Sequence, residues 1–448
     1  MLDGFPDLTR LHQCDPARYP HLLESVAHGT GQARYDILFA FPGEALTLHP
    51  DGRLTQSDRP LAGADFLSAF DNHWKTLAVP AAAGPELPFR GGWFVFLSYE
   101  LAPSIEPSVT GIAFEPGLPV ARATRCPAAI IRDHSQHQTY AVCEAEQADA
   151  CMPALLRDIQ TAAPETPAGL PMLTNAAEDL PERFLDGVAR VLDYIRAGDV
   201  FQVNLSRTWR AQLARATRPV DLYRRLRAAN PAPFAGLMSL GEGEAVMSSS
   251  PERLVCVHSR HVSTRPIAGT YPRSPDPEQD RAWSRELLRH PKERAEHVML
   301  LDLERNDLGR VCRAGTVKVS EMLTLESYRH VHHIVSEVRG ELHAETTPAT
   351  VLRAVFPGGT ITGCPKVRSM QIIAELEQAA RGAYTGSFGY INRDGDMDFN
   401  ILIRSITQHG RHISLRAGAG IVADSDPARE LDETRAKAKG MLAALGWS

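Results

Sequence analysis

The sequence predicts a protein of the α+β class, with helices and strands mixed along the chain. Apolar runs rich in aromatic and β-branched residues, such as ARYDILFAF and GGWFVFLSYEL, stand between glycines and prolines and indicate buried strands. Apolar residues recur at helical spacing from Pro181 to a stop at Gly198, and the strand-like segment VFQVNLSRTW follows. The carboxy-terminal part shows both kinds of pattern in turn.

Residues 385–420 are predicted to form a meander of three strands, because turn residues stand between apolar runs at Asp394-Gly395 and at Gly410. Asp426, followed by a proline, supplies an N-cap and a preferred first helical residue. We therefore expect a final helix that runs to about Leu445.

Residues 161–182 contain mostly alanine, proline, threonine and glycine, with few large apolar residues, and are predicted to be a linker. This boundary divides the chain into an amino-terminal region, 1–160, and a carboxy-terminal region, 183–448. Each region is long enough to bury a core of its own.

The charge balance excludes several classes of protein. The 448 residues include 48 basic and 54 acidic side chains, so the formal net charge is −6. A nucleic-acid-binding protein normally has a basic surplus or a basic face, so we expect no nucleic-acid partner. No apolar stretch approaches the roughly 18 to 20 residues that span a bilayer, which excludes a membrane protein. The first residues, MLDGFPDLTR, lack the apolar core of a secretory signal, and we expect a cytoplasmic protein.

The seven cysteines are scattered, without a C-x-x-C pair or a Cys/His cluster at zinc spacing. We expect them to be reduced thiols rather than a redox or metal site. This expectation agrees with a reducing compartment.

Two pairs of glutamates stand at helical spacing. Glu430 and Glu433 are three residues apart in the predicted final helix, with Lys437 one turn beyond, and Glu293 and Glu296 have the same spacing in PKERAEHVML. Two such pairs could face each other across a cleft and hold a magnesium ion through carboxylate oxygens. The same spacing also fits two solvated acidic helix faces.

Several short loops could bind or transform an anion. Gly418 and Gly420, in AGAGIVADSDP, could let backbone N–H groups approach an anion, or they could simply form a tight turn. The other candidates are Thr360 in FPGGTITGCPK, Glu252 in SSSPERLV, Thr270 in TRPIAGTYPR and His333 in HVHHIVSEV. For each of these residues alone, a structural role is the alternative, and for His333 without context a packed or exposed side chain is the favoured interpretation.

Taken together and in this order, the motifs resemble those of the chorismate-utilising enzymes. The series runs through SPERLV, RPIAGTYPR, AEHVMLLDLERNDLGRV, VHHIVSEVRG, FPGGTITGCPKVRSMQIIAELE, GSFGYI and GIVADSDPARELDETRAKAKGML, and covers residues 183–447 densely. The resemblance implies packed, mostly antiparallel sheets flanked by helices, as in anthranilate synthase, with 1–160 as the amino-terminal region and 183–448 as the chorismate-binding catalytic domain. It also implies magnesium as the cofactor.

The nucleophile that attacks chorismate differs within this family. Members that add water have a lysine base where this chain has Gln202, and this chain has no lysine between Lys75 and Lys292. The resemblance therefore favours the ammonia users, anthranilate synthase and aminodeoxychorismate synthase. In both, the large component is paired with a glutamine amidotransferase.

Between the two ammonia users, most of the distinguishing segments resemble component I of aminodeoxychorismate synthase. These segments are Gln202-Val203-Asn204, FPGGTITG, GSFGY and RYDILFAFP. Ala268 points the other way, because many aminodeoxychorismate synthases have a lysine nucleophile there and anthranilate synthases have alanine. We expect amination to 4-amino-4-deoxychorismate. Since alanine offers no nucleophile, either ammonia adds directly or another group substitutes for the lysine. Anthranilate synthase and a non-catalytic chorismate-binding relative are the alternatives.

The resemblance also implies roles for single residues. Glu296 and Glu433 would bind magnesium directly, with Glu293 and Glu430 adjacent to the ion. Glu252 would be the general acid for the leaving C4 hydroxyl, assisted by His333. The enolpyruvyl carboxylate would be held by Arg404 and Tyr384 and by the amides of Gly418 and Gly420. Thr270, Thr360, Lys437 and Ala268 would complete the pocket.

A separate subunit is expected to supply ammonia, because the chain has no G-x-C-x-G nucleophile that could hydrolyse glutamine. Near the start, LLES at Leu22–Ser25 resembles part of the tryptophan pocket of anthranilate synthases. Here we expect a structural remnant, or a bound tryptophan that does not inhibit.

Overall fold

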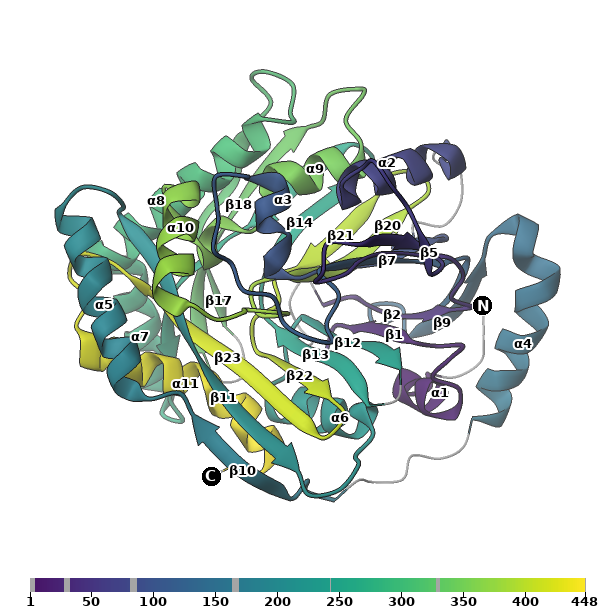
Figure 1. Cartoon of the computed structure of the whole chain (residues 1–448), viewed down its shortest axis with the longest axis horizontal. Coiled ribbons are helices and arrows are strands. Elements are labelled where there is room, and N and C mark those ends of the chain that lie inside the picture. Colours follow the sequence, from purple (N-terminus) through teal and green to yellow (C-terminus); the bar gives the residue numbers. More distant parts are fainter. Residues whose placement is uncertain are drawn as a thin grey trace.

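Two large antiparallel β-sheets stack on each other, and helices cover their outer faces (Figure 1). The computed structural model describes residues 5–27, 33–80, 87–162, 169–241, 243–327 and 331–447. This architecture confirms the predicted mixed fold of antiparallel sheets and helices.

The first sheet contains strands from both ends of the chain. Its order is β10 (Leu173–Glu178), β11 (Gln202–Leu213), β23 (His412–Ile421), β22 (Ser405–His409), β13 (Glu244–Ser250), β12 (Phe234–Gly241), β1 (His21–Glu24), β2 (Tyr35–Ala40), β8 (Ala128–Asp133) and β9 (Gln138–Cys143), and the short β19 (Gly363–Cys364) pairs with β11.

The second sheet is built in the same mixed way. Its order is β16 (Ile267–Pro272), β18 (Val331–Glu341), β15 (His261–Arg265), β14 (Arg253–His258), β21 (Met397–Asn400), β20 (Ser387–Asn392), β6 (Gly92–Leu97), β7 (Ala121–Cys126), β3 (Ala45–Leu48), β4 (Leu54–Gln56) and β5 (Arg59–Pro60), and β17 (Lys318–Ser327) pairs with β18.

The described helices vary from one turn to five turns. They are α1 (Leu8–Cys14), α2 (Phe66–Leu77), α3 (Ala102–Ile105), α4 (Ala148–Thr161), α5 (Pro181–Arg196), α6 (Pro219–Ala229), α7 (Pro277–Arg289), α8 (Pro291–Gly309), α9 (Pro348–Val355), α10 (Lys366–Glu377) and α11 (Pro427–Leu445). Among these helices in the described ranges, none is long and apolar enough to cross a lipid bilayer.

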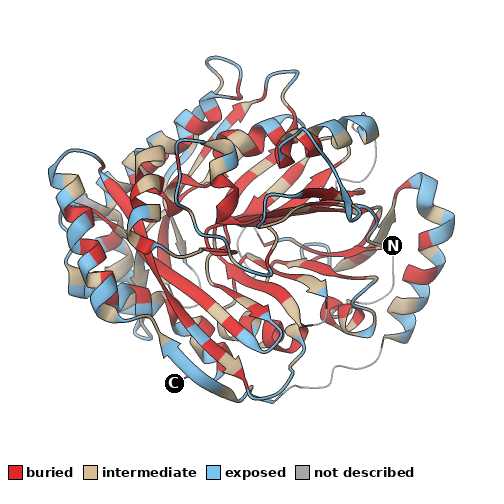
Figure 2. Ribbon diagram, viewed as in Figure 1, coloured by how far each residue is buried: buried red, intermediate tan, exposed pale blue. Residues whose placement is uncertain are grey.

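The core has an inner layer between the sheets and outer layers under the helices. Phe94 and Phe96 of β6 point inward and meet Phe39 of β2 and Phe388 of β20, whereas Trp93 packs outward under α2 and α9. Residues on both faces of β6 are therefore buried, as the apolar run GGWFVFL predicts. Figure 2 shows the consequence, with buried residues along the strands and exposed residues on the outer helices.

The helix predicted from Pro181 is confirmed as α5, and the final helix as α11, with Asp426 accepting a hydrogen bond from Arg429 N at 2.9 Å. The meander prediction was wrong in one respect. Residues 397–409 do not form one strand, because the chain leaves the second sheet after Asn400 and enters the first sheet at Ser405. The two strands are mostly buried and no glycine or proline stands between them, so the sequence does not mark the change of sheet.

The amino-terminal and carboxy-terminal regions share both sheets. Strand β1 pairs with β12, and β6 pairs with β20, so each sheet contains strands from before and after the predicted linker. Within that linker, residues 173–178 form the exposed edge strand β10, and residues 163–168 lie outside the described ranges. The division at 161–182 stays a prediction about the sequence.

Replacing Asp426 with alanine should destabilise the protein by about 1 kcal/mol, because it removes the side-chain acceptor at the N-terminus of α11. The measurement is the free energy of unfolding in urea. Asp424→Ala is the matched control, because Asp424 is exposed and precedes the helix. Equal effects of the two substitutions would contradict a capping role for Asp426.

Candidate active site

Glu252 lies buried in the turn between β13 and β14, with 5% of its surface exposed. Burial raises the pKa of its carboxyl group to about 7, and Thr360, the Ile267 backbone, Arg404 and Lys437 offset part of the shift. One carboxyl oxygen, Oε1, has no hydrogen-bond partner. A large share of the Glu252 carboxyl groups therefore still holds a proton at neutral pH.

His333 lies on β18, where its backbone pairs with Thr270 of β16. Burial lowers the pKa of the imidazole to about 4, and the positive charges of Arg404 and Lys437 act in the same direction. The ring contacts the Gly269 backbone, which partly opposes this shift. At neutral pH His333 is therefore an uncharged donor and acceptor beside two cations.

Arg404 lies in the crossing, residues 401–404, which leads from β21 of one sheet to β22 of the other. Its backbone φ is 57°, in the left-handed region that a non-glycine residue rarely adopts. Its main-chain carbonyl accepts a hydrogen bond from Ser249 N at 3.1 Å, which joins the crossing to β13. Burial lowers the pKa of its guanidinium group, while the charges of Glu252 and Glu433 favour the cation. Arg404 is thus a half-buried cation near these two carboxyl groups.

Gly418 and Gly420 are placed where a side chain would collide with site groups. A Cβ at Gly418 would lie 2.6 Å from Tyr384 Oη and 2.8 Å from Asn204 Oδ1, and one at Gly420 would lie 2.5 Å from Gln202 Nε2. The Lys437 ammonium donates to the Gly418 carbonyl at 3.1 Å. The glycines therefore let Tyr384, Asn204 and Gln202 approach β23 closely.

The two glutamate pairs reach this region from different helices. Glu293 of α8 places Oε2 2.9 Å from the position of a Cβ at Gly269, beside the His333 strand. Glu433 of α11 is ion-paired with Lys437 at 2.6 Å and lies close enough to Arg404 to affect its pKa.

Glu430, one turn before Glu433, is buried with 8% exposure, and Glu296 is half-buried. Within the described ranges no three histidine, cysteine or acidic side chains are grouped closely enough to form a ready metal site. The assignment of the four glutamates as ligands stays a prediction.

The predicted residues Thr270 and Ala268 both lie on β16, which pairs with β18. Thr270 is placed by its backbone pairing with His333, and its side chain lies outside what the structure describes. Ala268 pairs with Ile334 on β18, and the buried ring of His297 lies against the Ala268 backbone.

Sequence reasoning missed several polar residues around this region. Gln202 Oε1 and Asn204 Oδ1 are buried without hydrogen-bond partners, although both residues served only as markers of the family. Glu304 of α8 is buried near Glu252, and burial together with Asp307 raises its pKa to about 8. The spacing of Glu304 and Asp307 matches that of the predicted ligand pairs and was the available signal.

A separate cavity of about 310 Å³ lies between the sheets. Leu23, Glu24 and Ser25 of the LLES segment line it, together with Phe234 of β12 and Arg253 of β14. Since Arg253 follows Glu252 in the chain, β14 joins this cavity to the Glu252 region. Tryptophan binding in this cavity remains a prediction.

Residues 32–443 match the family described as chorismate binding enzyme, and the chain belongs to this family. Its relatives include the anthranilate synthase component 1 of Streptomyces coelicolor, 40% identical over 450 residues that cover 96% of this chain and 84% of the relative. The aminodeoxychorismate synthase component 1 of Bacillus subtilis is 39% identical over 408 residues, which cover 85% of this chain and 82% of the relative. The crystal structure of anthranilate synthase component I from Streptococcus pneumoniae superposes with a TM-score of 0.81 at 32% identity, covering 92% of this chain and 93% of that one.

Replacing Glu252 with glutamine should remove a pH-dependent cost of folding. The folded pKa near 7 exceeds the ordinary value of 4.5, so as pH rises between these values the unfolded chain releases a proton that the folded protein retains. The wild-type free energy of unfolding should therefore fall, relative to Glu252→Gln, by on the order of 3 kcal/mol from pH 4 to pH 8.

Urea unfolding at the two pH values measures this difference. Glu182→Gln, at an exposed position on α5, is the control and should keep the wild-type pH dependence. If Glu252→Gln also kept it, Glu252 would not carry the raised pKa.

Proposed function

We propose that the protein is component I of an aminodeoxychorismate synthase, which aminates chorismate to 4-amino-4-deoxychorismate for 4-aminobenzoate and folate synthesis. The observation that carries the proposal is the buried, protonated Glu252 beside the two cations Arg404 and Lys437. A proton donor next to fixed positive charges suits a dianion that loses a hydroxyl group.

Glu252 acts as the general acid. The bond between C4 of the ring and its hydroxyl oxygen breaks, and the hydroxyl leaves as water with the proton of Glu252. Ammonia forms the new carbon–nitrogen bond and then loses one proton, which restores the acid. His333, uncharged at neutral pH, assists by hydrogen bonding at the same end of the site.

The two carboxylates of chorismate need different partners. Arg404 and the Tyr384 hydroxyl bind the enolpyruvyl carboxylate, because a guanidinium group and a phenol are donors that suit a planar anion. The backbone amides of Gly418 and Gly420 support this carboxylate. Lys437, Thr360 and Thr270 complete the pocket, and Ala268 leaves space for the ring.

The predicted ligand residues have the donor type that a magnesium ion prefers. Glu296, Glu433, Glu293 and Glu430 offer carboxylate oxygens, which are the donors that magnesium prefers, and they approach the site from α8 and α11. When bound, magnesium would neutralise the ring carboxylate and withdraw electron density from the conjugated ring. Glu433 would exchange its ion pair with Lys437 for the metal.

Asn204 favours the aminodeoxychorismate product, and Ala268 favours anthranilate. The buried amide oxygen of Asn204, without a hydrogen-bond partner, lies beside Gly418, so the residue that distinguishes the Gln202-Val203-Asn204 segment faces the site. Ala268 removes the lysine nucleophile and makes direct addition of ammonia necessary. Anthranilate synthase is therefore the second candidate.

A glutamine amidotransferase subunit is the proposed ammonia source, because both kinds of relative carry the name component 1. A partner would deliver neutral ammonia, which is the nucleophilic form. The cytoplasm is the proposed location, since all seven cysteines are free thiols.

The product assay separates the candidates. The purified chain, with chorismate, magnesium and ammonium at high pH, should consume chorismate without producing anthranilate fluorescence. A pyruvate-eliminating lyase added afterwards should then release 4-aminobenzoate. Anthranilate fluorescence before the lyase is added would identify an anthranilate synthase instead, and chorismate binding without consumption would identify a non-catalytic relative.

Glu433→Gln should reduce magnesium-dependent turnover or magnesium affinity by at least about tenfold, because it removes a charged ligand oxygen. Asp432→Asn is the matched control, since Asp432 is the preceding residue of α11 and its side chain is 76% exposed. Turnover is measured across a magnesium titration. Unchanged magnesium dependence in Glu433→Gln would remove Glu433 from the ligand set.

A further inference from the structure

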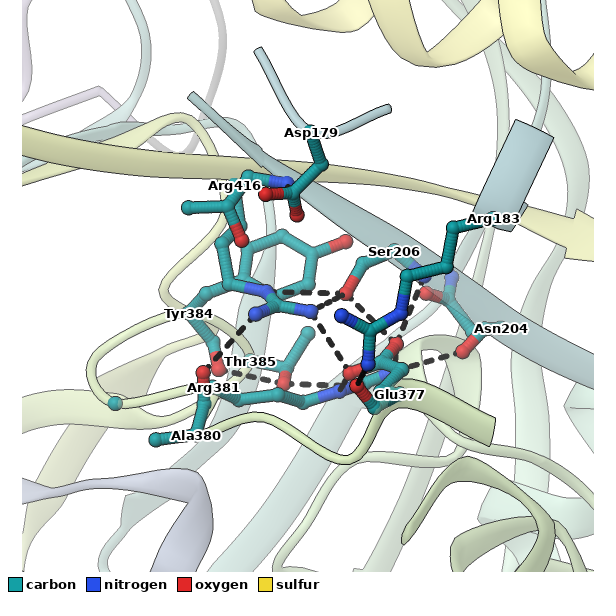
Figure 3. Close-up of polar contacts among 12 residues, drawn as sticks. Asp179, Arg183, Asn204, Ser206, Glu377, Ala380, Arg381, Tyr384, Thr385 and Arg416 are labelled. Atoms are coloured by element: carbon teal, nitrogen blue, oxygen red, sulfur yellow. Dashed lines mark hydrogen bonds and ion pairs between the residues drawn. The ribbon is translucent and has the colours of Figure 1, made fainter. Parts of the chain in front are cut away.

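Arg381 lies in the loop after α10 and has 4% of its surface exposed. Its guanidinium carbon stands 4.7 Å from the centre of the Tyr99 ring and 5.6 Å from that of Tyr384. Figure 3 shows the group beneath Tyr384 and beside Glu377. Arg381 has no assigned role in the proposed reaction, although it packs against a proposed substrate-binding residue.

The guanidinium donates five hydrogen bonds. Nε and Nη2 donate to the two carboxylate oxygens of Glu377 at 3.0 and 2.7 Å. Nη2 also donates to the Asn204 carbonyl at 2.7 Å, and Nη1 donates to the Ile361 carbonyl and the Thr385 hydroxyl, each at 3.2 Å. Because every N–H donor of the Arg381 guanidinium group is used, its orientation is fixed.

Each neutral acceptor belongs to a segment that carries a site residue. Ile361 follows Thr360 in the chain, Thr385 follows Tyr384, and Asn204 lies on β11 opposite Gly420. Arg381 therefore joins three segments that are distant in sequence at one side of the candidate site.

Thr385 extends this connection to Arg404. Thr385 has a backbone φ of 62° and donates its N–H to the Leu402 carbonyl at 2.8 Å. Leu402 N donates back to the Gly386 carbonyl at 2.8 Å, so the Tyr384 loop and the crossing before Arg404 are paired. Left-handed residues such as Thr385 and Arg404 persist only where surrounding contacts determine them.

We propose that Arg381 is a positioning residue. Through its hydrogen bond to Thr385 and its contact with the Tyr384 ring, it orients the side chains of Tyr384 and Arg404 toward one carboxylate of the substrate. This inference rests on the proposed function, because it assumes that Tyr384 and Arg404 bind the enolpyruvyl carboxylate. Arg381 itself does not touch the substrate.

The charge around Arg381 is suited to this role. Glu377 also accepts from Arg416 Nη2 at 2.9 Å, so one carboxylate neutralises two guanidinium groups only in part. Ser206 donates to Glu377 from its N–H and its hydroxyl, each at 2.8 Å, which holds the carboxylate in place. Arg381, Arg416 and Glu377 together carry one net positive charge behind Tyr384, which favours an anion in front of it. Burial raises the pKa of the neighbouring Glu100 to about 7, so its carboxyl group opposes this charge only in part at neutral pH.

Arg183 provides a matched control within the same cluster. It is exposed on α5 and donates to the Glu377 main-chain carbonyl, on the side away from Thr385 (Figure 3). Arg183→Gln therefore removes an arginine bonded to the same glutamate without affecting the three neutral acceptors of Arg381.

The experiment measures binding of 3-(1-carboxyvinyloxy)benzoate, a stable molecule with both carboxylates of chorismate, by calorimetry with magnesium present. Arg381→Gln should weaken binding by about tenfold in the wild-type background. In a Tyr384→Phe background the same change should cost less, about threefold, because one of the two positioned groups is already absent. Thr385→Val keeps the β-branched shape, tests the same connection with less disturbance of the core, and should also weaken binding.

Arg183→Gln should bind as the wild type does. If Arg381→Gln and Tyr384→Phe had additive effects, or if folded Thr385→Val bound normally, the positioning role would be wrong. If Arg381→Gln does not fold, the Thr385→Val and Tyr384→Phe pair decides the matter by the same test of additivity. A wild-type chain that fails to bind the dicarboxylate would instead refute the proposed function, whereas binding without turnover would leave the Arg381 test valid.

Discussion

The crossing of the chain between the two sheets at residues 401–404 is the constraint on which the candidate site depends. Because β21 belongs to one sheet and β22 to the other, the segment between them cannot follow strand geometry. It turns through a left-handed residue, and that residue is Arg404. The crossing is held by Ser249 of β13 and by the main chain of Glu252, whose carbonyl accepts from Ile401 N at 3.0 Å. The proposed acid and the proposed anion-binding cation are thus tied to the same few residues of backbone.

Burial of charge determines the protonation states around this crossing. Burial raises the pKa of Glu252 to about 7 and lowers that of His333 to about 4, because it opposes a negative charge on one and a positive charge on the other. Arg404 stays a cation because guanidinium groups do not lose their proton in proteins. Two cations, Arg404 and Lys437, therefore lie beside these two groups and suit a substrate with two carboxylates.

Much of this could be predicted from local patterns in the sequence, and the rest depends on distant contacts. The cap at Asp426 and the helix of α11 are local, so propensity was sufficient to predict them. The ordered motifs were specific enough to indicate the family, which the match over residues 32–443 confirms. The change of sheet after Asn400 has no local signal, because no glycine or proline stands between the two strands. Arg381 was also missed, since its importance comes from acceptors on β11, near Thr360 and after Tyr384, which only the folded chain brings together.

The mixing of early and late strands within both sheets has a consequence for synthesis of the chain. Phe96 on β6 pairs with Phe388 on β20, so this edge of β6 has no partner strand until β20 has been synthesised. Neither sheet can close early, and contacts of such long sequence separation make assembly slow. A newly made chain therefore exposes one edge of an aromatic strand, β6, until β20 is available.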